Sequence, residues 1–221
     1  MGVSDDRRLV LLDAYALIYR AYYAFIKNPR ITSQGFNASA VFGFTNTLYE
    51  LIRKEQPSHI AVVFDPPGPT GRSEEFAEYK ANREAQPEDI TLSIPLIMKV
   101  VRGFRIPTLM VPGYEADDVI GTLAKRAESH GYEVFMVTPD KDYAQLVTDK
   151  IFMYKPGRQG GDVEILGPAE VREKFEVERP EQVIDLLGMM GDAVDNIPGI
   201  PGVGQKTAIK LIAQYGSMEG L

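Results

Sequence analysis

Hydrophobic residues along the chain gather in short runs, several of which end in an acid. Runs of this length that are rich in β-branched and apolar residues predict strands. They are LVLLD ending at Asp13, IAVVFD at Asp65, IPTLMVPGYE at Glu115, VFMVTPD at Asp140, and KIFMYK over 150–155. Apolar residues at helical spacing between these runs predict helices. These helices cover about 14–27, 38–55, 90–104 and 116–130.

The alternation of strands and helices predicts an α/β fold with a mainly parallel sheet that is flanked by helices. In such sheets ligands bind beyond the carboxyl ends of the strands. The acids at the ends of the hydrophobic runs are therefore expected to meet at one rim of the sheet, although they are far apart in the sequence.

Two segments depart from this alternation. Residues 66–90, PPGPTGRSEEFAEYKANREAQPEDI, are rich in proline, glycine and charge, which predicts an excursion over the rim with a short amphipathic piece inside it. From about 180 the pattern turns wholly helical, with a helix at 181–190, a glycine-rich hairpin, and a second helix that ends near Gly216. We therefore predict an α/β core over 1–178 that includes the 66–90 excursion, and a helix-hairpin-helix element over 179–221.

Composition narrows the kinds of site that the rim can form. The chain has 221 residues, 44% of them hydrophobic, which is enough for one globular domain. No apolar stretch is long enough to span a bilayer and MGVSDDRR lacks a signal peptide's apolar region, so a cytoplasmic protein without membrane contact is expected. Cysteine is absent and histidine occurs twice, so a metal site would need oxygen ligands.

Nine carboxylates form the candidate metal site. They are Asp13, Asp65, Glu115, Asp117, Asp118, Asp140, Asp142, Asp192 and Asp195. Two like charges about 4 Å apart repel by about 4 kcal/mol at an effective dielectric constant near 20, so the group must bind cations or protonate. Oxygen ligands favour Mg²⁺ or Mn²⁺, and two such ions support the in-line hydrolysis of a phosphodiester. Each acid alone also has a structural explanation, as a strand-end, helix-cap or turn residue, so the interpretation depends on their convergence.

Net charge does not exclude a nucleic-acid partner. The formal charge is −7, from 24 bases and 31 acids. If the nine acids are neutralised by metal, 22 acids remain against the 24 bases, and the rest of the chain is close to neutral.

Basic and aromatic residues near these acids are candidates for contact with nucleic acid. Arg72, Tyr79, Lys80 and Arg83 belong to the 66–90 excursion, where Lys80 and Arg83 would lie on adjacent faces of a helical turn and reach a scissile phosphate, although a solvated charged face is the alternative. Tyr19 is placed to stack on a base, although core packing is the alternative. The hairpin at Gly202 and Gly204 would present bare N–H groups to a phosphate, with Lys206 and Lys210 adding charge, although a packing corner remains open.

Six motifs carry a resemblance to a known family: LLDAYALIYRAYYAF, FDPPGPT, EYKANR, PGYEADDVIGTLAKRA, VTPDKDYAQLV and GDAVDNIPGIPGVGQKTAIKLI. Together they resemble the 5′ nuclease domain at the N-terminus of bacterial DNA polymerase I, in the flap endonuclease family. The resemblance implies a PIN-like nuclease core with a helical arch or clamp, a helix-three-turn-helix element, and two-metal hydrolysis of DNA at 5′ flaps or nicked and gapped duplexes.

The resemblance also implies roles for particular residues. Asp13, Asp65, Glu115, Asp117 and Asp118 would surround one ion, and Asp140, Asp142, Asp192 and Asp195 the other. Lys80, Arg83, Asp13 and Asp117 would serve catalysis, and Tyr19 would stack on a base. The remaining residues expected to bind DNA are Arg20, Arg72, Tyr79, Gly199, Gly202, Gly204, Gln205, Lys206 and Thr207, with K⁺ as a further ion at the hairpin.

Two features depart from the family pattern. Gly71 stands where the family usually has an aromatic residue, which leaves the order at the start of the arch open, and the chain stops at Leu221 just after Ser217 begins what reads as a new helix. We therefore expect a monomeric fragment of a polymerase I chain without polymerase activity. A PIN-like ribonuclease and a non-catalytic junction-binding module remain alternatives, and a phosphoacceptor receiver domain is a weaker one.

Overall fold

The computed structural model of the protein describes residues 7–157 and 161–221. Its centre is a six-stranded sheet in the order β3-β2-β1-β4-β5-β6. The strands are β1 (Arg8–Asp13), β2 (His59–Val63), β3 (Thr108–Leu109), β4 (Glu133–Val137), β5 (Ile151–Lys155) and β6 (Glu164–Leu166). The first five run parallel, and β6 pairs antiparallel with β5. The prediction of a mainly parallel sheet is confirmed.

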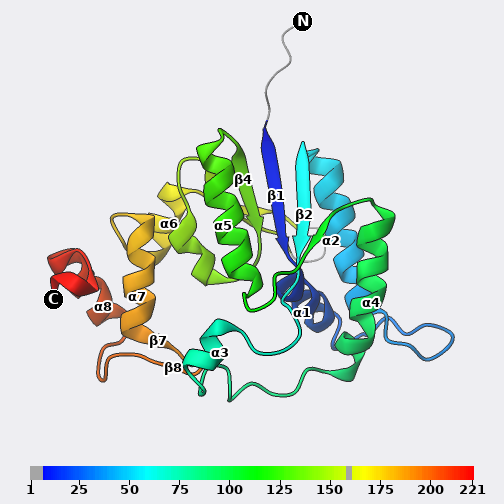
Figure 1. The fold of residues 1–221 in the computed structure, drawn as a ribbon, viewed down its shortest axis with the longest axis horizontal. Coiled ribbons are helices and arrows are strands. Elements are labelled where there is room, and N and C mark those ends of the chain that lie inside the picture. The colour runs from blue at the N-terminus through cyan, green and yellow to red at the C-terminus, as the bar shows by residue number, and fades with distance from the viewer. Residues whose placement is uncertain (1–6, 158–160) are drawn as a thin grey trace, which may run out of the picture.

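Helices cover both faces of the sheet (Figure 1). One face is packed by α1 (Ala14–Ala24), α2 (Ser39–Glu55) and α4 (Glu88–Gly103). On the other face, α5 (Ala116–Ser129), the 3-10 helix η1 (Lys141–Leu146) and α6 (Pro168–Phe175) contact the strands, and α7 (Val183–Met190) and α8 (Gln205–Tyr215) extend the same hydrophobic core outward. The short helices α3 (Gly71–Glu75), η3 (Pro180–Gln182) and η4 (Met218–Gly220) complete the described chain. None of the described helices is long and apolar enough to cross a membrane.

Side chains along β1 point alternately into the two hydrophobic cores, one on each face of the sheet. Val10 and Leu12 are buried against α1, α2 and α4, whereas Leu11 is buried on the opposite face with α5. Because side chains alternate between the faces of a strand, a slip of one residue would exchange the two sets. The register of β1 is therefore set by burial on both faces.

Strand order places the acidic rim at a topological switch point. The chain runs from β1 to β2 and β3 on one side, then crosses to β4 and β5 on the other. Asp13 ends β1, and Asp65 and Asp140 follow β2 and β4 within a few residues. Crevices of this kind hold ligands in α/β sheets. In Figure 1 the strands point down to this rim, where α3 and the short strands β7 and β8 also lie.

Several local expectations differ from the structure. The 164–175 region forms β6 and α6, which the sequence analysis did not predict. The region after 180 is not wholly helical, because β7 (Gly191–Asp192) pairs antiparallel with β8 (Ile197–Pro198). The helical turn expected at Lys80 and Arg83 is wrong: Lys80 has φ 57°, and successive turns replace a helix there. A left-handed residue interrupts the helical hydrogen-bond ladder.

Candidate active site

Asp13 occupies the most enclosed position on the rim. It ends β1 and begins α1, where its Oδ1 accepts a hydrogen bond from the Ala16 N–H at 3.1 Å. Its Oδ2 accepts hydrogen bonds from the Thr138 and Tyr143 hydroxyls, both at 3.2 Å. Burial and the nearby Asp65 carboxylate raise the pKa of Asp13 to about 7, although these hydrogen bonds oppose the shift. Within residues 7–157 and 161–221 this carboxylate has no positive partner, and it would gain from a cation beside it.

The EADD stretch serves both as the start of α5 and as part of the acidic rim. Glu115 and Asp118 form a capping box, in which the Glu115 N–H donates to Asp118 Oδ2 at 3.1 Å. Asp65 also contributes, because its Oδ1 accepts from the Ala116 N–H at 2.8 Å. Acids are stabilised at this end of a helix by the free N–H groups and the helix dipole. The structural and the functional explanations of these residues are therefore compatible.

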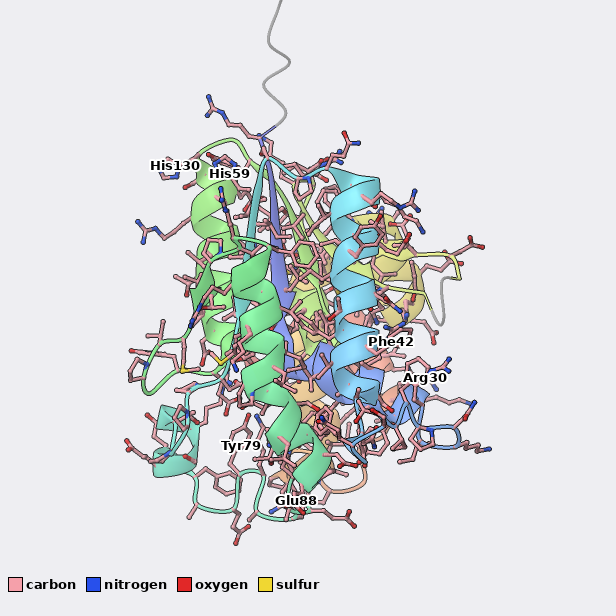
Figure 2. All side chains as sticks on the ribbon, turned by 90° about the vertical axis from the view of Figure 1, so that its right-hand side faces the viewer. Arg30, Phe42, His59, Tyr79, Glu88 and His130 are labelled. Carbon is pink, nitrogen blue, oxygen red and sulfur yellow. The ribbon has the colours of Figure 1, made fainter. Side chains whose placement is uncertain are left out.

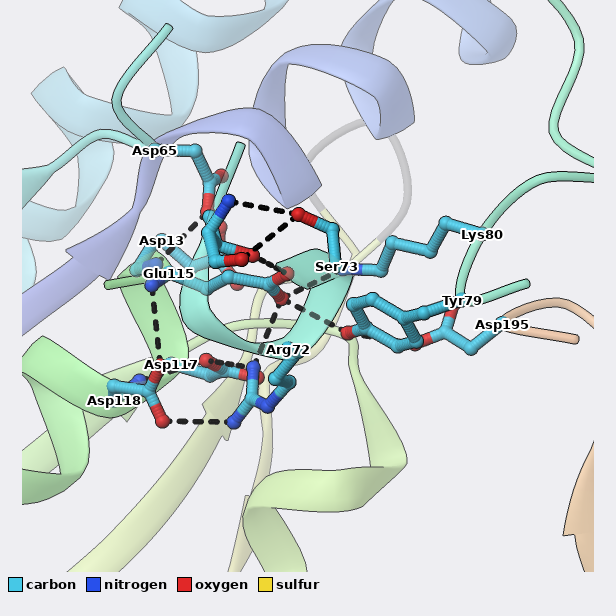
Figure 3. Close-up of polar contacts among 12 residues, drawn as sticks. Asp13, Asp65, Arg72, Ser73, Tyr79, Lys80, Glu115, Asp117, Asp118 and Asp195 are labelled. Carbon is cyan, nitrogen blue, oxygen red and sulfur yellow. Dashed lines mark hydrogen bonds and ion pairs between the residues drawn. The ribbon is translucent and has the colours of Figure 1, made fainter. Parts of the chain in front are cut away.

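Arg72 bridges the three acids of this stretch (Figure 3). One guanidinium nitrogen donates to Glu115 at 2.9 Å and to Asp117 at 3.0 and 3.1 Å, and the other donates to Asp118 at 2.7 Å. The pKa of Asp117 is nevertheless raised, because burial outweighs the guanidinium. The guanidinium of Arg72 thus lies among carboxylates that were predicted to hold a metal.

Tyr79 and Lys80 bring further donors to Glu115. Lys80 Nζ lies 2.6 Å from Glu115 Oε2, and the Tyr79 hydroxyl donates to the same oxygen at 3.0 Å. Glu115 is only 7% exposed, and burial alone would raise its pKa. Lys80, Tyr79 and Arg72 reverse that effect, so the pKa of Glu115 is lowered. Lys80 therefore points into the acidic rim, as its predicted role requires.

The second group of acids is built from η1 and the β7–β8 turn. Asp192 accepts from Lys141 Nζ at 2.5 Å and from the Val194 N–H at 2.8 Å, and Asp195 is paired with Arg83. Burial and the neighbouring Asp140 raise the pKa of Asp142 to about 6. These acids gather beside one another without enough positive charge to offset them all.

One atom in this group is left without a hydrogen bond. Asp142 Oδ1 is buried and has no hydrogen-bond partner in the described part of the chain, and Lys141 Nζ lies 3.7 Å away. A buried carboxylate oxygen normally finds a partner. The chemistry of this donor set, all oxygen and in part unpaired, fits a hard divalent cation.

The carboxylates do not yet form a coordination shell. In residues 7–157 and 161–221, no three His, Cys, Asp or Glu side chains stand together in a group ready to hold a metal ion. Both histidines, His59 and His130, lie at the end of the molecule opposite Tyr79 (Figure 2). The rim therefore offers carboxylates and not imidazoles, as the composition predicted.

The 66–90 segment, here called the arch, is held on the rim by backbone as well as side-chain hydrogen bonds. The Lys80 N–H donates to the Asp195 carbonyl at 2.9 Å, Asn82 donates to the Ala193 carbonyl at 2.8 Å, and Asn196 donates to the Glu78 carbonyl at 2.8 Å. Segments more than a hundred residues apart in the sequence thus form one surface over the acids.

Tyr19 and Arg20 take different environments on α1. Tyr19 is half-buried, donates from its hydroxyl to Gln86 at 3.3 Å, and has its ring 6.4 Å from that of Tyr23. Arg20 lines a cavity of about 1200 Å³ beside α1 and α2, and donates to the carbonyls of Pro156 and Gly157, each at 2.5 Å. Tyr19 thus borders the arch, whereas Arg20 is engaged with backbone.

The glycines of the hairpin divide into two kinds. A Cβ on Gly199 would lie 2.4 Å from the Met190 carbonyl carbon, so this glycine is explained by close packing. Gly202 has φ 81°, which favours glycine, and a Cβ on Gly204 would meet no atom within 4 Å. Gly204 is the N-cap of α8, and it and the next three residues, Gln205, Lys206 and Thr207, are exposed. The start of α8 is therefore open to a phosphate.

Four residues that contact the acids were not singled out from the sequence. Thr138 and Tyr143 hold Asp13, Thr70 donates to Glu115 at 3.1 Å, and Lys141 pairs with Asp192. Lys141 could have been found from the sequence, because it lies inside the DKD motif. The role of Tyr143 could not, because a tyrosine followed by Ala144 and Leu146 is equally typical of a core residue.

Nearly the whole chain is similar to known protein families and relatives. Residues 8–176 match the family described as 5′-3′ exonuclease, N-terminal resolvase-like domain, and residues 178–221 match 5′-3′ exonuclease, C-terminal SAM fold. A 5′-3′ exonuclease of Aquifex aeolicus is 40% identical over 215 residues, 97% of this chain and 72% of the relative. DNA polymerase I of Bacillus caldotenax is 41% identical over 216 residues, 97% of this chain and 24% of the relative.

A solved structure agrees with these matches. The D15 protein of T5, co-crystallised with metal ions, superposes with a TM-score of 0.72 at 25% identity, covering 97% of this chain and 77% of that one. The chain spans about a quarter of the length of the polymerase relatives that it matches. Because the family match covers most of the sequence, the chain belongs to the 5′-3′ exonuclease family.

Proposed function

We propose that the chain is a structure-specific 5′ nuclease that hydrolyses DNA phosphodiesters near a junction between single strand and duplex. The observation that carries the proposal is that three basic side chains of the 66–90 segment, Arg72, Lys80 and Arg83, reach acids of both predicted groups on the rim. The family membership and the metal ions in the T5 relative's structure support it. Primer removal and repair are the processes that such cleavage serves.

The carboxylates would hold two divalent ions, Mg²⁺ or Mn²⁺. The first group is Asp13, Asp65, Glu115, Asp117 and Asp118, and the second is Asp140, Asp142, Asp192 and Asp195. When bound, two such ions supply the charge that activates a water and stabilises the leaving oxygen. The Asp142 oxygen without a hydrogen bond and the raised pKa of Asp13 support this assignment, because each carboxylate would gain from a cation bound beside it.

Residues of the chain would position the DNA around this centre. Lys80 and Arg83 already reach the rim from the arch, so both lie where a scissile phosphate would need positive charge. Tyr19, which borders the arch at Gln86, would stack on a base. The open N-terminus of α8 would hold a duplex phosphate, with K⁺ at the hairpin as the resemblance implies.

The proposal extends to the setting of the chain. We expect a monomer that acts on 5′-flapped, nicked or gapped DNA in the cytoplasm as the nuclease part of a polymerase I chain, divided into a core over 1–178 and a hairpin element over 179–221. Gel filtration with and without a flapped duplex measures the stoichiometry.

Cleavage by an Asp117→Asn variant tests the function. The substitution removes one charge with little change of shape at a side chain that is 39% exposed, so the fold should persist. We expect wild type to cut a 5′-flapped duplex only with Mg²⁺ and to leave single-stranded RNA intact, and the variant to lose turnover. Asp149→Asn, at an exposed turn residue, is the matched control. A variant within about tenfold of wild type, near 1.4 kcal/mol in barrier, would contradict the metal assignment.

A further inference from the structure

Arg72 lies in a position that its predicted role in DNA binding does not explain. Its guanidinium makes four hydrogen bonds, all to carboxylate oxygens of Glu115, Asp117 and Asp118, over 2.7–3.1 Å. A planar guanidinium is well suited to bridging carboxylates. Here it spans three of the acids assigned to one metal ion.

The charges show that Arg72 neutralises this group only in part. Three carboxylates carry three negative charges, and Arg72 with Lys80 supplies two positive ones. A divalent ion in place of the guanidinium would bring twice its charge to the same oxygens. The Coulomb attraction of these carboxylates to a divalent ion therefore exceeds their attraction to the guanidinium.

The segment that carries Arg72 is held lightly enough to move. Helix α3 has five residues, none of them buried. It is also held by the Thr70–Ser73 cap, by a hydrogen bond from the Gly71 N–H to the Gly113 carbonyl at 3.0 Å, and by one from the Thr70 hydroxyl to Glu115 at 3.1 Å. The Arg72 side chain is 41% exposed, so solvent reaches it. Without buried apolar area, α3 depends on these few polar contacts for its place on the rim.

We propose that Arg72 is an internal cation of the metal site, which a divalent ion displaces, and that its release loosens α3 and frees the guanidinium for a phosphate. The inference rests on the proposed function, because it assumes that these carboxylates bind metal. In the metal-free protein Arg72 holds α3 against the acids, while Lys80, Asn82 and Arg83 hold the rest of the arch on the rim. Metal entry then couples the formation of the site to the release of α3.

Hydrogen exchange and metal binding, measured without DNA, test this coupling. The Glu74 and Phe76 amides donate to the Thr70 and Arg72 carbonyls, so peptides covering 71–79 report on α3. In wild type, exchange in these peptides should accelerate when Mn²⁺ is added. In Arg72→Ala it should already be fast without metal and should not respond to it.

The Mn²⁺ affinity, measured from the electron paramagnetic resonance of the free ion, should rise about tenfold in Arg72→Ala, a coupling in the usual range for competing ligands. Arg72→Gln is a second variant of similar length and should show the same gain. Arg102→Ala removes an equal charge from an exposed arginine at the end of α4, and should stay within about twofold of wild type. Circular dichroism melts confirm that each variant is folded.

The outcomes separate the two proposals. If Mn²⁺ binds wild type and Arg72→Ala equally and leaves exchange in 71–79 unchanged, Arg72 is a permanent structural bridge and the inference is overturned while the metal site stands. If neither protein binds Mn²⁺, the proposed function itself fails, and this inference fails with it.

Discussion

Asp13→Asn should make the metal-free protein more stable at neutral and alkaline pH. Asp13 is 7% exposed, and burial and Asp65 raise its pKa from 3.8 to about 7. Between these values the folded state binds a proton that the unfolded state does not, so stability falls as pH rises from about 4 to about 7 and then levels. Asparagine removes the buried charge and keeps an oxygen for the Ala16 N–H, while the Thr138 and Tyr143 hydroxyls can turn to accept from its amide.

The magnitude follows from the two pKa values. The gap from 3.8 to about 7 corresponds to about 4 kcal/mol, which is an upper bound because the site can relax and admit water. A gain of about 1–3 kcal/mol above pH 8 is therefore expected for Asp13→Asn. Asp142, whose pKa burial raises to about 6, acts with the same sign and remains in the variant, so some pH dependence persists.

Urea unfolding in the presence of a chelator, at intervals from pH 4.5 to 8.5, measures this effect. The difference in unfolding free energy between Asp13→Asn and wild type should grow with pH and flatten above about 7. Asp149→Asn, at an exposed turn, should run parallel to wild type. If Asp13→Asn also runs parallel to wild type, Asp13 is not a buried charge without a counterion, and the argument for a cation beside it loses its basis.

Substitutions at three further residues test the roles proposed for single side chains. Lys80→Ala should lower the single-turnover rate on flapped DNA by about a hundredfold and weaken binding much less, because positive charge beside a phosphate acts mainly in the transition state; equal losses in both would make Lys80 a docking charge. Gly204→Ala should weaken duplex binding and make the salt dependence of binding shallower. The protein's melting temperature should not fall, because the new Cβ meets no atom within 4 Å. Unchanged affinity would return the hairpin to a packing role, whereas Gly202→Val would be ambiguous because Gly202 has φ 81°. Tyr19→Leu should weaken binding of the single-stranded flap by about tenfold and Tyr19→Phe should not, since a stacked base requires the ring and not the hydroxyl; equal effects would implicate the Gln86 hydrogen bond instead.

The sheet and its acidic rim were predictable from the sequence because their cause is local. Both faces of the sheet are buried, so short hydrophobic runs such as LVLLD can be recognised as strands. Parallel strands then bring their carboxyl ends to one edge of the sheet. Asp13, Asp65 and Asp140 therefore reach the same rim wherever the loops run. The segment 164–175 was missed because α6 buries one residue, Val171, and has too few apolar positions to show a helical period.

Contacts across the rim were not predictable, because each depends on where two loops meet. The EADD stretch indicated an acidic site. No neighbouring residue in the sequence predicted that Arg72 would bridge its carboxylates, or that the Lys80 N–H would donate to the Asp195 carbonyl. Likewise, the sequence GIPGVG does not distinguish the role of Gly199 from that of Gly202. In the structure Gly199 packs closely against Met190, whereas Gly202 has φ 81°.

The sequence by itself determined the parallel strands, the helices α1, α2, α4 and α5 that cover them, and the position of the acids, since periodicity and strand direction act over a few residues. Only the tertiary structure decided which cation faces which carboxylate, because that choice depends on the path of the 66–90 segment across a rim assembled from distant parts of the chain. The same carboxylates can be neutralised by arginine, lysine or metal, and geometry alone selects among them.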